Sequence, residues 1–183
     1  MTVRAFGAQS MVLPLRRVLV RRPDAAFADA DPATWHYSAR PDLAAAQEEH
    51  DAFVRILSAA GVEIICHDAP APGLADAIYV HDPVLITERG AILMRMGKPL
   101  RRGEEDAIGR RLEAAGVPIH YQLHDDALGE AGDCLWLDAS TLAVGQGYRT
   151  NAAGLAQLRQ ALDPAIDILP VPLPYFTGPE ACL

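Results

Sequence analysis

The chain has 183 residues, of which 50% are hydrophobic and 22% charged, a composition that favours a folded chain with a buried core over a disordered one. Its formal net charge is −8, and no run of basic residues is longer than a pair such as Arg101-Arg102, so we expect no nucleic-acid partner. No apolar stretch approaches the roughly 20 residues of a membrane span, and the N-terminus lacks a signal-peptide core, so we expect no membrane association.

The cysteine pattern agrees with a reducing compartment. Cys66, Cys134 and Cys182 are odd in number, widely spaced and never arranged as CxxC. This spacing is atypical of a disulfide framework or a zinc knuckle. We therefore expect a cytoplasmic location.

The first predicted elements are a helix and a strand. Apolar residues between Leu43 and Leu57 recur at helical spacing, and Gly61 is expected to take the left-handed position after the helix end. A β-prone run follows at 62–65. The motif LSAAGVEII, which begins at Leu57, returns as LEAAGVPIH, which begins at Leu112. The chain therefore uses one helix–turn–strand unit at least twice.

A third and looser copy follows near the end of the chain. The stretch NAAGLAQLRQAL places Leu155, Leu158 and Leu162 at helical spacing, with Thr150 or Asn151 as its cap, and IDILPVPL then predicts a strand. Strand pairs precede the later helices: DAIYVHDPVLIT with GAILMRM, and GDCLWLD with TLAVGQG. The order strand, strand, helix, strand indicates an array or propeller. From periodicity alone, a doubly wound α/β sheet stays an alternative.

Polar residues at the strand ends are the candidate functional groups, although each has a simple structural explanation. If DAIYVHDP is a strand, Tyr79 and His81 share one face, and Asp82 lies at the strand end before Pro83. Asp82 could equally begin a turn. Glu130, Asp133, Arg149 and Arg101 could likewise be turn, cap or solvated residues.

Two further motifs do not support a cofactor or a metal. In GQGYRTNAAG, Thr150 stands where a dinucleotide-binding GxGxxG needs glycine. In HYQLHDD, His120 and His124 would share a strand face at a separation too long for one metal ion. We therefore expect neither a bound cofactor nor a metal site.

Four stretches resemble a known enzyme family. DAIYVHDPVLIT, PLRRGEE, EAGDCLWLDASTLAVGQGYRTN and GPEACL are similar to the dimethylarginine dimethylaminohydrolase branch of the guanidino-group-modifying enzymes, which includes arginine deiminases and amidinotransferases. The resemblance covers most of the chain. It implies an α/β fold of the pentein type, a β/α propeller of ββαβ units that is incomplete here, with about three units in a single domain over residues 1–183.

The resemblance also implies roles for individual residues. Glu130 matches the family's catalytic acid, which reaches the substrate guanidinium, and Asp82 matches the second carboxylate that holds this group. Arg101 and Arg149 match contacts to the substrate's α-carboxylate, and Asp76 matches a further acid of the substrate pocket. Facing carboxylates suit a guanidinium, because it is planar, permanently charged and forked.

Two further positions carry expectations of their own under this resemblance. His81 stands where the family commonly has Glu, so it is a candidate contact for the substrate or a structural histidine. Asp133 is expected to hold its turn through hydrogen bonds from its side chain to the backbone.

The end of the chain departs from the family. The family's His-Leu-x-Ser segment, with the general acid/base, and its nucleophilic Cys follow the position of Leu183 and do not occur here. Cys182 is not expected to replace the nucleophile. We expect this chain to be inactive alone, and we expect its exposed apolar faces to favour self-association or binding of a C-terminal complementing segment.

Three hypotheses follow. The first is part of a cysteine-dependent hydrolase that cleaves a guanidino C–N bond of arginine or N-methylated arginine, for example converting dimethylarginine to citrulline and dimethylamine. The second is a truncated, non-catalytic binding or complementing subunit, or an amidinotransferase. The third is a nucleotide-binding α/β domain.

Overall fold

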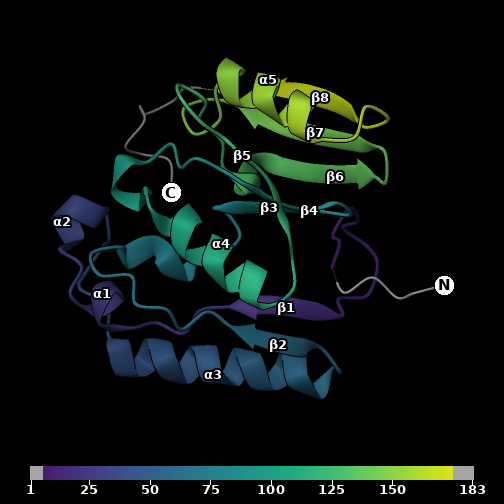
Figure 1. The fold of residues 1–183 in the computed structure, drawn as a ribbon. Helices are drawn as coiled ribbons and strands as arrows, with labels where there is room; N and C mark the ends of the chain where they lie inside the picture. Colours follow the sequence, from purple (N-terminus) through teal and green to yellow (C-terminus); the bar gives the residue numbers. More distant parts are fainter. Residues whose placement is uncertain (1–5, 175–183) are drawn as a thin grey trace. The chain divides into compact units, whose positions relative to one another are not determined.

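A β-hairpin followed by a helix and a parallel third strand occurs twice in the computed structural model, which describes residues 6–174 (Figure 1). In the first copy, β3 (Val84–Thr87) and β4 (Gly90–Leu93) are antiparallel, and β5 (Ile119–Gln122) is parallel to β4 after α4 (Glu104–Ala114). In the second, β6 (Cys134–Asp138) and β7 (Thr141–Gln146) are antiparallel, and β8 (Asp167–Pro172) is parallel to β7 after α5 (Ala152–Ala161).

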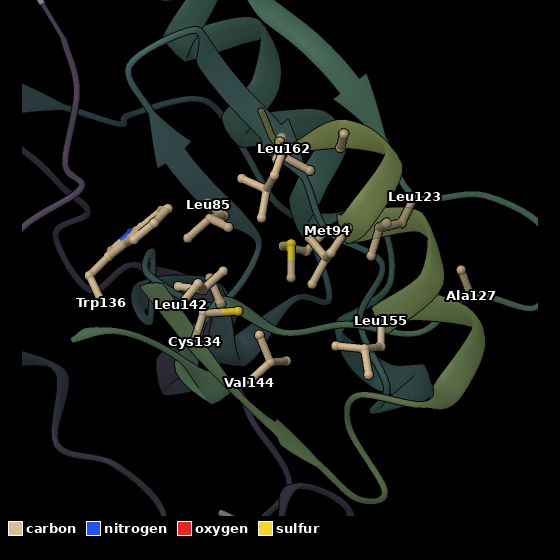
Figure 2. Packing of buried hydrophobic residues seen from close by; sticks show 14 residues of the cluster. Leu85, Met94, Leu123, Ala127, Cys134, Trp136, Leu142, Val144, Leu155 and Leu162 are labelled. Carbon is tan, nitrogen blue, oxygen red and sulfur yellow. The ribbon is translucent and has the colours of Figure 1, made fainter. Parts of the chain in front are cut away.

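These two copies share one hydrophobic core. Leu142 and Val144 point to the same face of β7, as the period of a strand requires, and both are fully buried. Figure 2 shows them grouped with Cys134 of β6, and Leu155 of α5 belongs to the same cluster. The strands of the first copy add Leu85 to this cluster. The core therefore fixes both ββαβ copies in one body, to which residues 6–13 and 81–174 belong.

A second compact unit contains residues 14–80. Its elements are β1 (Arg17–Val20), α1 (Ala25–Ala28), α2 (Pro32–Trp35), α3 (Leu43–Ala59), β2 (Glu63–Cys66) and the 3-10 helix η1 (Ala75–Ile78). The strands β1 and β2 are parallel, and α3 lies between them in sequence. A single strand thus precedes the helix here, so among the described residues this copy has no hairpin.

The repeated helix end has the same geometry in both copies. Gly61 and Gly116 have φ angles of 80° and 81°, in the left-handed region that glycine tolerates. After α3, the amide of Val62 donates to the carbonyl of Leu57, and after α4 the amide of Val117 donates to the carbonyl of Leu112. This is the Schellman arrangement, and it confirms the predicted role of Gly61.

Two predictions about the fold are wrong. DAIYVHDP does not form a strand: Ala75–Ile78 is a 3-10 helix, the amide of Tyr79 closes it on the carbonyl of Asp76, and β3 begins only after Pro83. The doubly wound sheet is also wrong, because the described strands form separate sheets of two, three and three strands. That one domain spans residues 1–183 stays a prediction.

Residues 6–174 contain neither a membrane-spanning helix nor a cluster of metal ligands. None of their helices is long and apolar enough to cross a membrane. Nor do their His, Cys, Asp and Glu side chains form a group of three that could hold a metal ion.

Candidate functional site

A pocket of about 370 Å³ lies in the unit that contains the two ββαβ copies. Loops at the ends of its strands and short 3-10 turns supply the wall, which consists of Asp82, Arg101, Glu130, Gly132, Asp133, Gly147, Tyr148, Arg149, Leu173 and Pro174. Four of the predicted site residues, from four separate segments, therefore meet here: Asp82, Glu130, Arg101 and Arg149.

Glu130 is held from several sides. It precedes the 3-10 helix η3 (Ala131–Asp133), and only 5% of its surface is exposed. Its Oε1 accepts hydrogen bonds from the amides of Gly97 at 2.9 Å and Lys98 at 3.4 Å. Nη1 of Arg149 donates to Oε1 at 3.1 Å and to Oε2 at 3.0 Å. A nearly buried carboxylate is thus balanced by a guanidinium and by backbone amides.

Asp82 shares its arginine with a second acid. Arg101, in η2 (Pro99–Arg101), donates from Nη1 to Asp82 Oδ2 at 2.6 Å. Its Nε and Nη2 contact the Glu104 carboxylate, with Nη2 to Oε2 at 2.8 Å. Burial lowers the pKa of Arg101, but the hydrogen bonds that Arg101 donates to Glu104 and Asp82, with the charges of these acids, outweigh burial and raise that pKa above its ordinary value. Arg101 therefore stays charged inside the protein.

Sequence reasoning missed Glu104, which is only 2% exposed. It lies three residues after Arg101, in the stretch PLRRGEE, at the start of α4. A spacing of three between opposite charges at a helix start is the signal that could have indicated this pair. Because the same spacing is common on exposed helix faces, only the structure distinguishes a buried pair from a solvated one.

Thr150 links Glu130 to Asp133. Its hydroxyl donates to Asp133 Oδ2 at 2.6 Å and accepts from the amide of Glu130 at 3.2 Å, and its surface is fully buried. Burial raises the pKa of Asp133, and the neighbouring charges of Glu130 and Asp82 add to this effect. The expectation that Asp133 holds its turn by bonding the backbone is therefore corrected: its carboxylate bonds a side chain and lines the pocket.

The small residues of the EAGD motif have a steric purpose. A Cβ at Gly132 would lie 2.5 Å from Oδ1 of Asp82, a contact that real Cβ atoms do not make. The amide of Ala131 donates to the carbonyl of Asp82 at 2.8 Å. Glycine at 132 thus lets the loop before β3 approach the turn before β6, which brings Asp82 and Glu130 into one pocket.

Asp76 and His81 are not in the wall of this pocket. Asp76 belongs to the other unit, where it is buried in η1 and accepts a hydrogen bond from the Tyr37 hydroxyl at 2.6 Å. His81 is exposed in the turn before β3, and its carbonyl accepts from the amide of Val84. Their predicted contacts with substrate stay predictions.

Neither described cysteine lines the pocket. Cys134 lies in the core, where burial raises the pKa of its thiol to about 12, so it is protonated at neutral pH. Cys66 is exposed on β2 in the other unit. Cys182 lies outside the described residues.

Residues 19–168 match the family model described as N,N dimethylarginine dimethylhydrolase, eukaryotic. The chain is 34% identical over 152 residues to the N(G),N(G)-dimethylarginine dimethylaminohydrolase of Streptomyces coelicolor and 30% identical over 148 residues to that of Pseudomonas aeruginosa. These alignments cover 83% and 81% of this chain but 57% of each relative, so the chain spans little more than half the length of the curated relatives it matches.

Solved structures agree with this result. A mutant of the Pseudomonas aeruginosa enzyme complexed with citrulline superposes with a TM-score of 0.76 at 27% identity, over 91% of this chain and 64% of that chain. The complex of an AgrE mutant with L-arginine gives a TM-score of 0.72 at 26% identity, over 88% of this chain and 24% of that chain. The ββαβ copies described above thus recur in these structures.

Proposed function

Because this chain belongs to the N,N-dimethylarginine dimethylhydrolase family and has part of its propeller fold, we propose that its pocket binds the guanidino group of an arginine derivative. In this proposal Glu130 is the catalytic residue of this part of the site. Asp82, Arg101, Arg149 and Asp76 bind substrate, and His81 is a further candidate contact. The substrate class is arginine or N-methylated arginine. No metal or cofactor takes part in the proposed reaction.

The observation that carries the proposal is the pairing of two of the pocket carboxylates, Glu130 and Asp82, with guanidinium groups. Glu130 contacts the guanidinium of Arg149, and Asp82 contacts that of Arg101 at 2.6 Å. Each carboxylate therefore already has a position and a charge that suit the functional group of the proposed substrate. Charge-assisted hydrogen bonds of this type are about twice as strong as neutral ones.

The proposed chemistry is hydrolysis of a guanidino C–N bond. A cysteine thiolate attacks the guanidinium carbon, a histidine protonates the departing dimethylamine, and water then releases citrulline and frees the thiol. Glu130 and Asp82 hold the guanidinium and its positive charge during these steps. Cys134 is unsuited to be the nucleophile because its thiol pKa is about 12. The thiolate and the histidine are therefore proposed to come from other residues of the complete active site.

Substitution of Glu130 tests the assignment. Glu130→Gln keeps the shape of the side chain but removes its charge, so affinity for Nω,Nω-dimethyl-L-arginine should fall by about tenfold or more in isothermal titration calorimetry. Glu113→Gln removes a charge from an exposed position of α4 and is the matched control. Thermal melts of both variants check folding. Unchanged affinity in Glu130→Gln would show that Glu130 does not contact the ligand.

We also propose that the chain works with a second copy of itself or with a complementing segment. Four exposed apolar side chains support this proposal: Leu135, Leu137, Leu169 and Val171. The truncated-subunit and amidinotransferase hypotheses share this requirement for further residues. Immunoblotting of the native polypeptide against a 19.7 kDa standard distinguishes a complementing segment of the same chain from a second copy, because a larger band indicates a covalent complementing segment.

A further inference from the structure

The two oxygens of the Asp133 carboxylate have different surroundings in the pocket wall. Oδ2 accepts a hydrogen bond of 2.6 Å from the hydroxyl of Thr150, which is fully buried. Oδ1 lies near Gly145 of β7: a Cβ added to this glycine would lie 3.4 Å from Oδ1 and 2.9 Å from Cδ1 of Leu173. Within the described part of the chain, Oδ1 accepts no hydrogen bond. Asp133 thus has one oxygen with a polar partner and one near an apolar side chain.

The charges around Asp133 favour its neutral form. Burial raises the pKa of this carboxyl, and the charges of Glu130 and Asp82 raise it further. The hydrogen bond from Thr150 and the opposite charge of Arg149 offset only part of this effect. The pocket region contains more acids than guanidinium groups: Asp82, Glu104, Glu130 and Asp133 against Arg101 and Arg149. The other titratable group next to Asp133, the Cys134 thiol, is uncharged at neutral pH.

The hydrogen bonds at Asp133 are compatible with either protonation state. A proton on Oδ1 removes the charge near Leu173, while Oδ2 still accepts from Thr150. The Thr150 hydroxyl also accepts from the amide of Glu130 at 3.2 Å, and this contact does not involve Oδ1. The proton can therefore leave Oδ1 without rearrangement of the backbone that carries Glu130.

From this geometry we propose that Asp133 is a proton-releasing group of the pocket: it carries a proton on Oδ1 without ligand and loses it when a cationic guanidino ligand binds. The inference rests on the proposed function, since it takes Glu130 and Asp82 to hold the guanidinium. The O–H bond breaks, its electron pair stays on Oδ1, and the proton passes to solvent. One positive charge enters and one proton leaves, so the total charge of the pocket is unchanged.

This exchange makes binding depend on pH. A guanidinium is positively charged and stabilises the ionised form of Asp133, so binding favours loss of the proton. By linkage, affinity rises with pH by up to about tenfold per pH unit while the ligand-free Asp133 is protonated, and it levels off above the raised pKa. A pocket whose acids are all ionised without ligand would show no such rise.

Calorimetry of the wild-type chain with Nω,Nω-dimethyl-L-arginine measures the released proton directly. The heat of binding includes the ionisation heat of the buffer for each proton released, so titrations in MES and in Bis-Tris at the same pH should give different heats. Between about pH 5 and pH 7, the difference should correspond to a maximum of one proton per ligand, and affinity should rise with pH. Equal heats in the two buffers throughout this range would overturn the inference.

Two variants assign the proton to its residue. Asp133→Asn keeps an oxygen for the hydrogen bond from Thr150 and is uncharged, as the protonated acid is. Its affinity should stay near the low-pH affinity of the wild type at every pH, and the difference between buffers should disappear. Asp138→Asn, at an exposed position of β6, should release the proton as the wild type does. Thermal melts check the folding of both variants. Proton release that persists in Asp133→Asn would also overturn the inference, because another group would then supply the proton.

The outcomes separate the inference from the proposed function. If dimethylarginine binds the wild type and loses affinity in Glu130→Gln but releases no proton, the proposed function is supported and the inference alone is wrong. If dimethylarginine binds the wild type at no pH, the proposed function is wrong and the inference is wrong with it.

Discussion

At the scale of single residues, the region of the pocket contains several buried charged side chains that would be unfavourable without partners. Asp82, Glu104 and Glu130 lie with Arg101 and Arg149 in one small region, and three of these five residues are less than 6% exposed. Buried charges of one sign are tolerated only when opposite charges and amides satisfy them. Removing any one member therefore disturbs its partner as well, so binding data need folding controls.

Asp133 makes stability depend on pH. Burial raises the pKa of its carboxyl, while Glu130, Asp82 and Arg149 face it from the neighbouring segments. The folded chain thus holds this proton more tightly than the unfolded chain, so the stability contributed by Asp133 is present at low pH and is lost as the pH rises through the raised pKa. Asp133→Asn should therefore gain stability relative to wild type as the pH rises from the ordinary carboxyl range toward neutrality.

Urea denaturation between about pH 4 and pH 8 measures this difference. The asparagine oxygen can still accept the hydrogen bond from Thr150, so the substitution changes mainly the charge. Asp138→Asn is the control of opposite sign, because hydrogen bonds from the amide and the hydroxyl of Ser140 lower the pKa of Asp138. The stability of the wild type should therefore increase relative to that of Asp138→Asn as the pH rises. A pH-independent difference for Asp133→Asn would contradict the assigned shift.

At the scale of elements, the helix ends are the best-predicted part of the fold. Gly61 and the Asn151 cap of α5 follow from local rules, since a left-handed residue needs glycine and an orphan amide needs a short polar side chain. The strand predicted at DAIYVHDP is wrong because the segment forms a 3-10 helix, closed by the hydrogen bond from the amide of Tyr79 to the carbonyl of Asp76, despite the β-propensity of its residues. The pairing of Arg101 with Glu104 and the approach of Asp82 to Gly132 depend on tertiary structure, so spacing alone does not predict them.

The twin helix ends give a matched pair of substitutions. Gly61 and Gly116 have nearly the same φ, and a Cβ at either position would meet no atom within 4 Å. Alanine therefore adds backbone strain without a steric clash, and each variant should lower the free energy of unfolding by about 1 kcal/mol. Urea denaturation of the two variants measures the losses. A markedly larger loss at one site would mean that its helix end does more than terminate the helix.

The outer edge of β8 is poorly suited to further strand pairing. The amides of Asp167 and Leu173 point toward β7, because they donate to carbonyls at the beginning and the end of that strand, at 2.7 and 2.9 Å. Because the direction of the amides alternates along a strand, the even-numbered positions face away from β7. Pro170 and Pro172 occupy such positions and have no N–H. Prolines thus protect this edge, as edge strands commonly require.

At the scale of the whole molecule, one face of the β6–β8 sheet is a surface that suits a partner. Leu135 and Leu169 both lie opposite Ala143 in the register, so the three form a row on one side of the sheet. Leu135 is 48% exposed and Leu169 is 50% exposed, whereas Leu142 on the other side is fully buried in the core. Contiguous exposed apolar rows of this kind mark surfaces that associate with another protein.

Substitution of this row tests whether a second copy covers it. If copies associate through the face, the wild-type chain should sediment as a dimer or larger species at micromolar concentration, and the double variant Leu135→Gln, Leu169→Gln should sediment as a monomer. Ile56→Gln changes an exposed apolar residue of α3, outside the face, and should leave sedimentation unchanged. Because β8 ends its sheet with prolines, association should depend on side chains of the face and not on strand pairing. A monomeric wild-type chain would exclude the second copy as the occupant and leave the complementing segment as the proposal to pursue.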